Sequence, residues 1–214
     1  SYAVIATRPG GTSVLVRQER EPPVPGAGQV LIRHAAIGVN FIDIYFRKGL
    51  YPWPVAGNLI LGSEGGGLVE SLGEGVTGLR IGQLVAYTLP NGSYAIHRAV
   101  LAAHVVALPD DIDEATAAAV MLKGLTAHYL LHHSFPAKEG DTVLFHAAAG
   151  GVGLIAGQWL SANGVRAIGT AGGAAKCALA RAHGFTDTID YRAEDFVAHI
   201  RDLTAGKSVQ AVYD

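Results

Sequence analysis

A glycine-rich segment between two apolar runs is the feature that most restricts how this chain can fold. Residues 146–153 read HAAAGGVG, and they lie between the apolar runs Thr142–Phe145 and Leu154–Ala156. Glycine loses more conformational entropy on folding than any other residue, so this cluster of glycines needs a structural reason. Either two backbones pack closely at this point or a ligand approaches the main chain.

The segments that follow residue 142 alternate between strand-like and helix-like patterns. We expect strand, helix, strand, helix, strand, helix and a last strand over Val209–Tyr213, with Gly164 and Gly184 at the C-terminal ends of two helices. The third helix should bury one face, formed by Phe196, Ile200 and Leu203. Such alternation predicts a parallel sheet with right-handed crossovers. The glycine segment then joins the first strand to its helix.

In that position the glycine segment fits a phosphate-binding loop. Gly151–Ala156 matches the pattern G-x-G-x-x-[GA], in which the bare backbone lets a pyrophosphate approach the N–H groups of the following helix. The pattern alone would also suit a close-packed turn, but the flanking strand and helix favour a dinucleotide. A Walker-type loop is excluded, since no Gly-Lys-Ser/Thr follows. The predicted cofactor-binding residues of this loop are Ala149, Gly150, Gly151, Val152 and Gly153.

The first 110 residues have a pattern that is typical of β-strands. Glycine- and proline-rich segments separate short runs that are rich in β-branched residues or alternate between apolar and polar residues. These runs are Tyr2–Ile5, Ser13–Val16, Val30–Arg33, Leu84–Tyr87 and Val105–Leu108. Pro90–Gly92 predicts a hairpin turn. Gly65–Gly67 and Gly73–Gly75 predict tight corners of a small, strongly bent barrel.

The residue pattern changes from strand-like to helix-like near residue 110. Asp113 and Glu114 precede an alanine-rich run, and this predicts a helix that continues to about Pro136. We therefore expect two domains, residues 1–125 and residues 126–214.

Charge and cysteine content exclude several classes of protein. The net charge is -2 and the isoelectric point is near 6.5, so neither nucleic acid nor an anionic membrane surface is an expected partner. A single cysteine, Cys177, cannot form an internal disulfide and suits a reducing compartment, so we expect a cytoplasmic protein. Residues 142–165 lack Asp, Glu, Lys and Arg, but their five glycines indicate a buried strand, turn and helix rather than a membrane span.

Several short segments together resemble one known group. In the second half these are Gly140–Asp141, Leu144, Ala148–Gly151, Gly153, Gln158 and Ser161, and in the first half Gly38–Asp43, Gly49–Tyr51, Gly62–Gly65, Gly82–Val85 and Lys123–Thr126. In this order they resemble the quinone oxidoreductase/zeta-crystallin group of the medium-chain dehydrogenase/reductase superfamily. The resemblance implies an α/β protein with an N-terminal GroES-like β-barrel, a Rossmann-type sheet, and an active site in the cleft between them. It also implies that the Rossmann sheet is C-terminally incomplete, because the group continues with a second Rossmann half, so we expect this chain to be part of a longer product.

The superfamily contains zinc enzymes and zinc-free enzymes, and the residues here favour the second kind. A catalytic zinc needs three protein ligands. Ser63 precedes Glu64 where zinc members carry histidine, and Asn40 stands near where they carry cysteine. The pair His132–His133 has no partner at ligand spacing and is expected to be a surface pair at a helix end. The sequence predicts no metal site.

The resemblance also assigns roles to individual side chains. Asn40, Tyr45 and Tyr51 should line the nicotinamide and substrate cleft, and Thr126 should contact the cofactor. Tyr45 could instead be a core residue, and Asp43 could serve only to brace its own loop. We expect Glu64 to be structural. No convincing general acid is visible, so water is a candidate source of the second proton.

The choice of nicotinamide cofactor depends on the end of the second strand. Enzymes that prefer NAD place a carboxylate about 20 residues after the glycine loop, where it binds the ribose 2′-hydroxyl. Here that position falls in Gly169–Gly173, which contains no acid, and Lys176 follows. The resemblance assigns Lys176 and Tyr191 to the adenosine phosphate, which predicts NADPH, although Lys176 could also be an ordinary solvated helix residue.

The expected function is therefore NADPH-dependent reduction of a quinone by hydride transfer without a metal. Without a metal to polarise it, the substrate must itself accept hydride readily. A 2-alkenal or enone reductase is an alternative that the sequence does not separate. A crystallin-like structural role or RNA binding is a non-enzymatic alternative, although the charge balance disfavours RNA. The resemblance further implies a homodimer.

Overall fold

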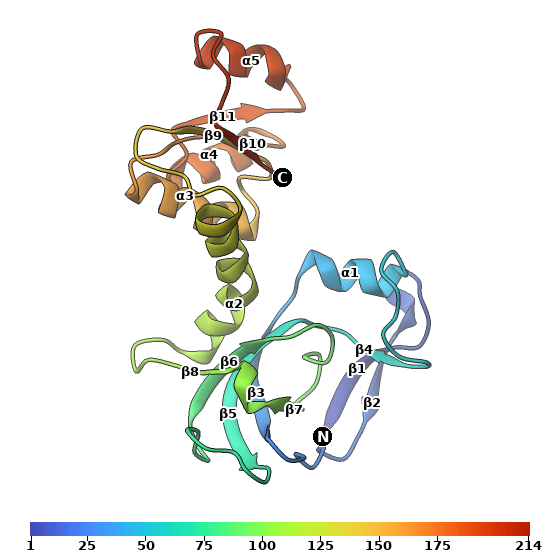
Figure 1. The fold of residues 1–214 in the computed structure, drawn as a ribbon. Helices are drawn as coiled ribbons and strands as arrows, with labels where there is room; N and C mark the ends of the chain where they lie inside the picture. The colour runs from blue at the N-terminus through green and yellow to red at the C-terminus, as the bar shows by residue number, and fades with distance from the viewer. The chain divides into compact units, whose positions relative to one another are not determined.

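The computed structural model describes all residues from 1 to 214, and these form two compact units. Unit 1 comprises Ser1–Leu122 and unit 2 comprises Lys123–Asp214. The chain passes from one unit to the other within helix α2, Glu114–Tyr129 (Figure 1). The domain boundary expected from the sequence, after residue 125, falls in the same helix.

Unit 1 is built from two antiparallel sheets. The larger has the strand order β7-β3-β5-β6-β8 and the smaller the order β2-β1-β4. The strands are β1 (Tyr2–Ala6), β2 (Leu15–Glu19), β3 (Gln29–Gly38), β4 (Leu59–Ile60), β5 (Glu64–Leu72), β6 (Leu84–Thr88), β7 (His97–Leu101) and β8 (Val105–Ala107). Helix α1 (Phe41–Lys48) and two short 3₁₀ turns, η1 (Thr12–Val14) and η2 (Ala102–His104), complete the unit. The expected β-rich first domain is confirmed.

The two sheets are linked by the short segment Tyr94–Ile96. The carbonyl of Tyr94 accepts a hydrogen bond from the N–H of Val4 at 2.7 Å, on β1 of the smaller sheet. The carbonyl of Ile96 accepts one from the N–H of His34 at 2.8 Å, on β3 of the larger sheet. A buried apolar cluster of the larger sheet consists of Val30, Ile32, Val69, Val85, Tyr87 and Val100. The backbone of this segment thus joins the two sheets by hydrogen bonds.

The predicted hairpin at Pro90–Gly92 is wrong. Asn91 and Gly92 do adopt positive φ values of 55° and 122°, as a tight turn requires. However, the turn connects β6 to β7, and these strands do not pair with each other. Instead the N–H of Gly92 donates to the carbonyl of Leu61 at 3.1 Å. Asn91 and Gly92 determine the local backbone conformation of the turn, whereas contacts between residues far apart in the sequence determine which strands pair.

The glycines expected at corners behave in two different ways. Gly65–Gly67 lies inside strand β5 rather than at a corner, so that prediction is wrong. A Cβ atom on Gly67 would lie 2.1 Å from the carbonyl oxygen of Arg33, which shows that close packing against β3 requires the bare backbone. Gly73–Gly75 does form a turn, in which the N–H of Gly73 donates to the carbonyl of Gln29 at 2.8 Å.

Unit 2 contains a parallel sheet in the order β11-β10-β9-β12. It starts with the C-terminal turns of α2 and a π-helical turn, η3 (Leu130–Ser134). The elements that follow are β9 (Thr142–Phe145), α3 (Gly151–Ala162), β10 (Arg166–Ala171), α4 (Ala174–Ala182), β11 (Asp187–Asp190), α5 (Phe196–Leu203) and β12 (Ala211–Tyr213). The predicted alternation and the parallel sheet are confirmed. Gly164 and Gly184 directly follow the C-caps of α3 and α4 with positive φ, as expected.

Helices cover both faces of this sheet (Figure 1). Val143 and Phe145 of β9 pack on one face with residues of α3 and α4, among them Ala156, Leu160 and Ala180. Leu144, between them in the sequence, points to the other face and packs with α5. The expected apolar face of α5 is confirmed, because Phe196, Ile200 and Leu203 all contact this second cluster.

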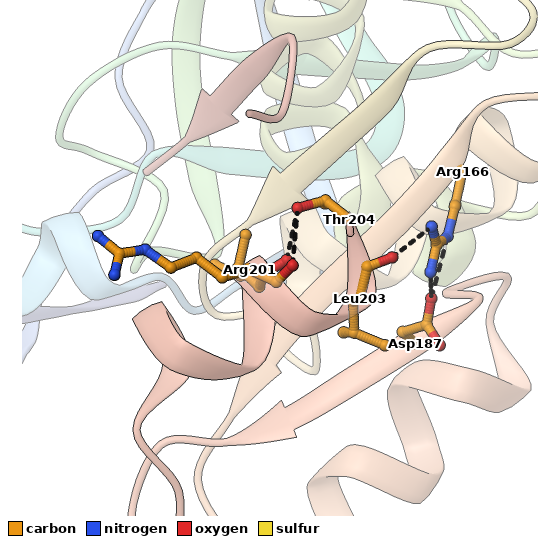
Figure 2. A network of polar contacts seen from close by, with 6 residues as sticks. Arg166, Asp187, Arg201, Leu203 and Thr204 are labelled. Carbon is orange, nitrogen blue, oxygen red and sulfur yellow. Dashed lines mark hydrogen bonds and ion pairs between the residues drawn. The ribbon is translucent and has the colours of Figure 1, made fainter. Parts of the chain in front are cut away.

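An ion pair ties the amino ends of two strands to the end of α5 (Figure 2). The guanidinium of Arg166, at the start of β10, donates to the carboxylate of Asp187, at the start of β11, with N–O distances of 2.8 and 3.2 Å. Arg166 also donates to the carbonyl of Leu203 at 3.0 Å. The Thr204 hydroxyl donates to the carbonyl of Ile200 at 2.7 Å. These hydrogen bonds satisfy carbonyl groups at the C-terminal end of α5, which is the negative end of its dipole. They lie at the amino ends of β10 and β11, whereas the glycine loops follow the carboxyl ends of β9 and β10.

Candidate active site

The first candidate residue, Asn40, is the N-cap of α1 and begins a buried polar network in unit 1. Its backbone N–H donates to Oδ2 of Asp43 at 2.9 Å. Asp43 is only 2% exposed and also accepts hydrogen bonds at 3.0 Å from the hydroxyls of Ser63 and Tyr94. Burial and the neighbouring Asp43 carboxylate raise the pKa of the Tyr94 phenol. Asp43 therefore braces the start of α1, which was one of the roles the sequence left open.

Glu64 lies beside Asn40 and is completely buried at the start of β5. Its Oε1 accepts a hydrogen bond from the side-chain amide of Asn40 at 2.8 Å, and its Oε2 accepts one from the backbone N–H of Leu122 at 2.7 Å. Gly38 makes room for it, because a Cβ atom there would lie 2.1 Å from Oε1. The sequence did not reveal this contact between Glu64 and Asn40.

Tyr45 and Tyr51 form an exposed aromatic pair at the other end of α1. Their ring centroids are 5.6 Å apart in an edge-on arrangement, and their side chains are 38% and 44% exposed. Gly49 ends the helix with φ of 75°, after which the N–H of Tyr51 donates to the carbonyl of Tyr45. Tyr45 is therefore not a core residue. All three predicted catalytic residues belong to α1 and its two ends.

In unit 2 the predicted phosphate loop has the expected local structure. Helix α3 begins at Gly151, with Gly150 as its N-cap and no side chain that caps its first N–H groups. A Cβ atom on Gly153 would lie 2.5 Å from the carbonyl oxygen of Ala148, so the close turn needs glycine at this position. Ala147 has a positive φ of 51°, a strained conformation that the sequence did not predict. An uncapped helix N-terminus after such a turn can bind an anion.

The second predicted phosphate site surrounds Gly172 and Gly173. Helix α4 begins just after Gly173, and Lys176 is exposed in its first turn. A Cβ atom on Gly172 would lie 2.6 Å from the hydroxyl of Tyr191 and 2.9 Å from Nε of Arg192. Arg192 was missed by the sequence analysis, although its place directly after Tyr191 was a usable signal. The structure thus gathers a phenol and a guanidinium beside this loop.

One carboxylate does lie near the same loop. Asp190, at the end of β11, accepts hydrogen bonds from the backbone N–H groups of Gly173 at 2.8 Å and Arg192 at 3.1 Å. It belongs to the third strand and not to the second, where NAD-preferring enzymes carry their acid. Its contacts hold the loop in shape.

Thr126 lies on α2, away from both glycine loops in the sequence. A Cβ atom on Gly151 would lie 2.7 Å from the side chain of Lys123, so α2 packs against the first turn of α3. Residues three apart on a helix share a face, which places Thr126 on the same side of α2 as Lys123.

The histidines at the end of α2 differ from expectation. His132 and His133 are exposed at a helix end, as predicted. They do have a partner, because the ring centroid of His128 lies 4.9 Å from that of His132 and 5.2 Å from that of His133. The π-helical turn explains the second contact, since it brings residues five apart onto one side. Trp159 packs beside the same rings.

Two further features bear on the kind of protein. No three or more His, Cys, Asp or Glu side chains lie together in a way that could hold a metal ion. None of the helices combines the length and the apolar character needed to cross a membrane.

Comparison with known proteins identifies the family. Residues 26–133 match the family described as "Alcohol dehydrogenase GroES-like domain", and residues 151–214 match the one described as "Zinc-binding dehydrogenase". The chain belongs to the medium-chain dehydrogenase/reductase superfamily. The family matches confirm the expected GroES-like first domain and the Rossmann-type second domain.

Relatives within this superfamily are similar along nearly the whole chain. A quinone oxidoreductase of Pseudomonas aeruginosa is 49% identical over 206 residues, which cover 96% of this chain and 63% of that protein. A 2-haloacrylate reductase of a Burkholderia species is 41% identical, over 99% of this chain and 65% of that protein. The structure of Escherichia coli quinone oxidoreductase complexed with NADPH is 41% identical with a TM-score of 0.97, and the match covers 100% of this chain and 66% of that one. The chain thus spans about two thirds or slightly less of the length of these relatives.

Proposed function

We propose that the protein carrying this chain reduces quinones with NADPH and without zinc. The proposal is supported above all by the residues around Gly172. The second strand, β10, ends there without an acidic residue. Tyr191 and Arg192 lie beside Gly172 and Lys176 lies in the first turn of the following helix, so all three can donate hydrogen bonds there. Its similarity to the quinone oxidoreductases of Pseudomonas aeruginosa and Escherichia coli supports the same activity. The structure of the Escherichia coli enzyme complexed with NADPH supports the same cofactor.

The cofactor would be bound by unit 2 at two anionic groups. The pyrophosphate suits the loop of residues 149–153 and the first turn of α3, whose N–H groups no side chain caps. The 2′-phosphate of NADPH suits the loop at Gly172, where an ammonium, a phenol and a guanidinium can donate to it. Thr126 would contact the cofactor from α2.

The substrate would be bound by the residues of α1. The exposed rings of Tyr45 and Tyr51 are inclined at 62° to each other, and each offers an aromatic face to a planar molecule. Asn40 offers an amide held by Glu64. NADPH supplies a hydride, which an electron-poor quinone accepts without help from a metal. Because this region holds Ser63 and Asn40 in place of metal ligands, we propose that no zinc takes part.

The assembly and location belong to the same proposal. We propose a homodimer, as the resemblance implies, that binds a small molecule and no nucleic acid. The only cysteine, Cys177, is buried as a free thiol, which suits a cytoplasmic enzyme.

A conjugated alkene is the second candidate substrate. The 2-haloacrylate reductase of Burkholderia, 41% identical over 218 residues, favours it. An activated alkene also accepts hydride without a metal, so the same site would serve. A panel of quinones, 2-alkenals and 2-haloacrylates, followed by the loss of NADPH absorbance, separates the two activities.

The cofactor half of the proposal is tested by the substitution Lys176→Ala. A charge-assisted contact to phosphate is worth roughly 1.5–3 kcal/mol, so kcat/KM with NADPH should fall by about ten- to a hundredfold, while kcat/KM with NADH should hardly change. Lys207→Ala is the matched control, since Lys207 is also an exposed lysine of unit 2. Equal losses with both cofactors would show that Lys176 supports the fold instead. Activity should also survive exhaustive chelation, and one tightly bound zinc per chain would contradict the metal-free mechanism.

A further inference from the structure

The buried carboxylate of Glu64 restricts the only side-chain amide among the candidate catalytic residues. Glu64 has no exposed surface, and each of its two oxygens accepts a hydrogen bond, one from the side-chain amide of Asn40 and one from the backbone of Leu122. The oxygens of a carboxylate accept hydrogen bonds from amide N–H groups. The contact of 2.8 Å therefore requires that Asn40 turns its NH₂ group, and not its oxygen, toward Glu64.

The alternative orientation of the Asn40 amide is disfavoured by electrostatics. If the amide were rotated by half a turn, its oxygen would face the Oε1 atom of Glu64 at hydrogen-bond distance in a buried place. Two acceptors would then face each other at hydrogen-bond distance and repel each other, which is costly beside a buried carboxylate. The carboxylate thus selects one of two amide orientations that would otherwise be nearly equal in shape.

The backbone around the pair leaves it little freedom to move. The N–H of Asn40 is held by Asp43, and Asp43 is held in turn by Ser63, the residue that precedes Glu64. Two successive residues, Ser63 and Glu64, therefore fasten the start of α1 by two separate hydrogen bonds. On the other side, Gly38 lies so close to Glu64 that any side chain there would displace the carboxylate.

From this geometry we propose that Glu64 is a positioning residue, which holds the amide of Asn40 in one orientation for the ligand. The proposal rests on the proposed function, in which Asn40 lines the substrate site. It replaces the expectation that Glu64 is merely structural. Asn40 then offers its ligand a fixed arrangement of its amide oxygen and of its second amide hydrogen.

The substitution Glu64→Gln tests the proposal with almost no change of shape. The glutamine oxygen is needed to accept from the N–H of Leu122, so its NH₂ group must face Asn40. Asn40 can satisfy it only by rotating its amide by half a turn. We expect kcat/KM for NADPH-dependent reduction of p-benzoquinone to fall by about tenfold, as the loss of one well-made hydrogen bond implies.

A double-mutant cycle with Asn40→Ala separates a positioning role from a structural one. If Glu64 acts through Asn40, Glu64→Gln should have little further effect on kcat/KM once the amide is gone. If the two losses multiply instead, Glu64 acts independently of Asn40 and the proposal is overturned. Thermal unfolding of all four proteins shows whether each variant folds.

A spectroscopic measurement keeps the test independent of the activity. The side-chain amide signal of Asn40 in a ¹H–¹⁵N spectrum, identified by its absence in Asn40→Ala, should be shifted downfield by the carboxylate and protected from exchange. It should move upfield in Glu64→Gln. An unchanged signal would refute the orientation. If the signal moves as expected but the protein reduces no quinone, the proposed function has failed while the orientation of Asn40 stands.

Discussion

The two units prepare their candidate binding surfaces in opposite ways. Unit 1 uses buried carboxyl groups, because Asp43 and Glu64 hold the start of α1 through hydrogen bonds to side chains and backbone. Unit 2 depends on glycines in its two loops, because a Cβ atom at Gly153 or Gly172 would meet neighbouring atoms. The comparison predicts that the site of unit 1 responds most to the loss of a buried polar partner, and the loops of unit 2 to the addition of a single methyl group.

The largest expected effect is a pH dependence that belongs to unit 1. His34 is held between the carbonyl of Ala95 at 2.7 Å and the hydroxyl of Tyr87 at 2.8 Å. Burial lowers the pKa of His34 from 6.5 to about 4, helped by the charges of Arg98 and His97 and opposed by the bond to Ala95. The unfolded chain then binds a proton between pH 6.5 and 4 that the folded chain does not. The free energy of unfolding should fall by up to about 3 kcal/mol as the pH falls through that range.

Urea unfolding of the wild type and of His34→Gln between pH 7.5 and 4.5 measures this effect. The wild type should lose stability more steeply than the variant, and the difference between them isolates His34 from other titrating groups. His104→Gln is the control, since His104 is exposed. Parallel curves for the wild type and His34→Gln would show that His34 takes up its proton equally in the folded and unfolded states.

The next effect belongs to unit 2 and needs no charge. Gly153→Ala places a methyl group 2.5 Å from the carbonyl oxygen of Ala148, and backbone atoms cannot move aside easily. We expect a loss of about 1–3 kcal/mol in the free energy of unfolding, seen as a lower Tm by circular dichroism. Gly124→Ala is the matched control in α2, where a Cβ atom would meet nothing within 4 Å. The control should be neutral or slightly stabilising, as helix propensity predicts, and equal losses in both variants would contradict the steric argument.

The smallest effect tests whether a side-chain charge contributes to unit 2 away from its loops. The pair Arg166–Asp187 is 38% and 27% exposed and has two N–O contacts, whereas the pair Arg17–Glu19 of unit 1 is 65% and 69% exposed. Double-mutant cycles on unfolding should give a coupling of about 1 kcal/mol for the first pair and close to zero for the second. A coupling as small for Arg166–Asp187 as for Arg17–Glu19 would mean that this ion pair adds nothing to the backbone pairing of β10 with β11.

Much of unit 2 and the residue types of its site could be predicted because their signals are local. Strand and helix periods, the glycine loop and the face of Phe196, Ile200 and Leu203 all depend on residues within a few positions of one another. Lys176 was reached by its short-range spacing from the glycine loop, whereas Tyr191 was given by the family resemblance. Their roles toward a cofactor remain proposals, as do those of Asn40, Tyr45, Tyr51 and Thr126.

The predictions that proved wrong concern features that the local residue pattern does not determine. Pro90–Gly92 forms a turn but no hairpin, because β6 and β7 find their partners elsewhere in the sheet. Gly65–Gly67 looked like a corner, yet it lies within a strand because β3 approaches it closely. His128 was overlooked as a partner of His133, because a spacing of five becomes a contact only in a π-helical turn.

The amino-acid order alone was therefore sufficient for the βαβ alternation, the local structure of the glycine loop and the absence of an acid after the second strand. Folding in three dimensions was needed to bring Glu64 to Asn40, Ser63 to Asp43, and Arg192 to Gly172. The physical reason is the range of the interactions. Backbone preference and hydrophobic period act between neighbours along the chain, whereas a buried hydrogen bond joins residues whose separation in sequence carries no information about their distance.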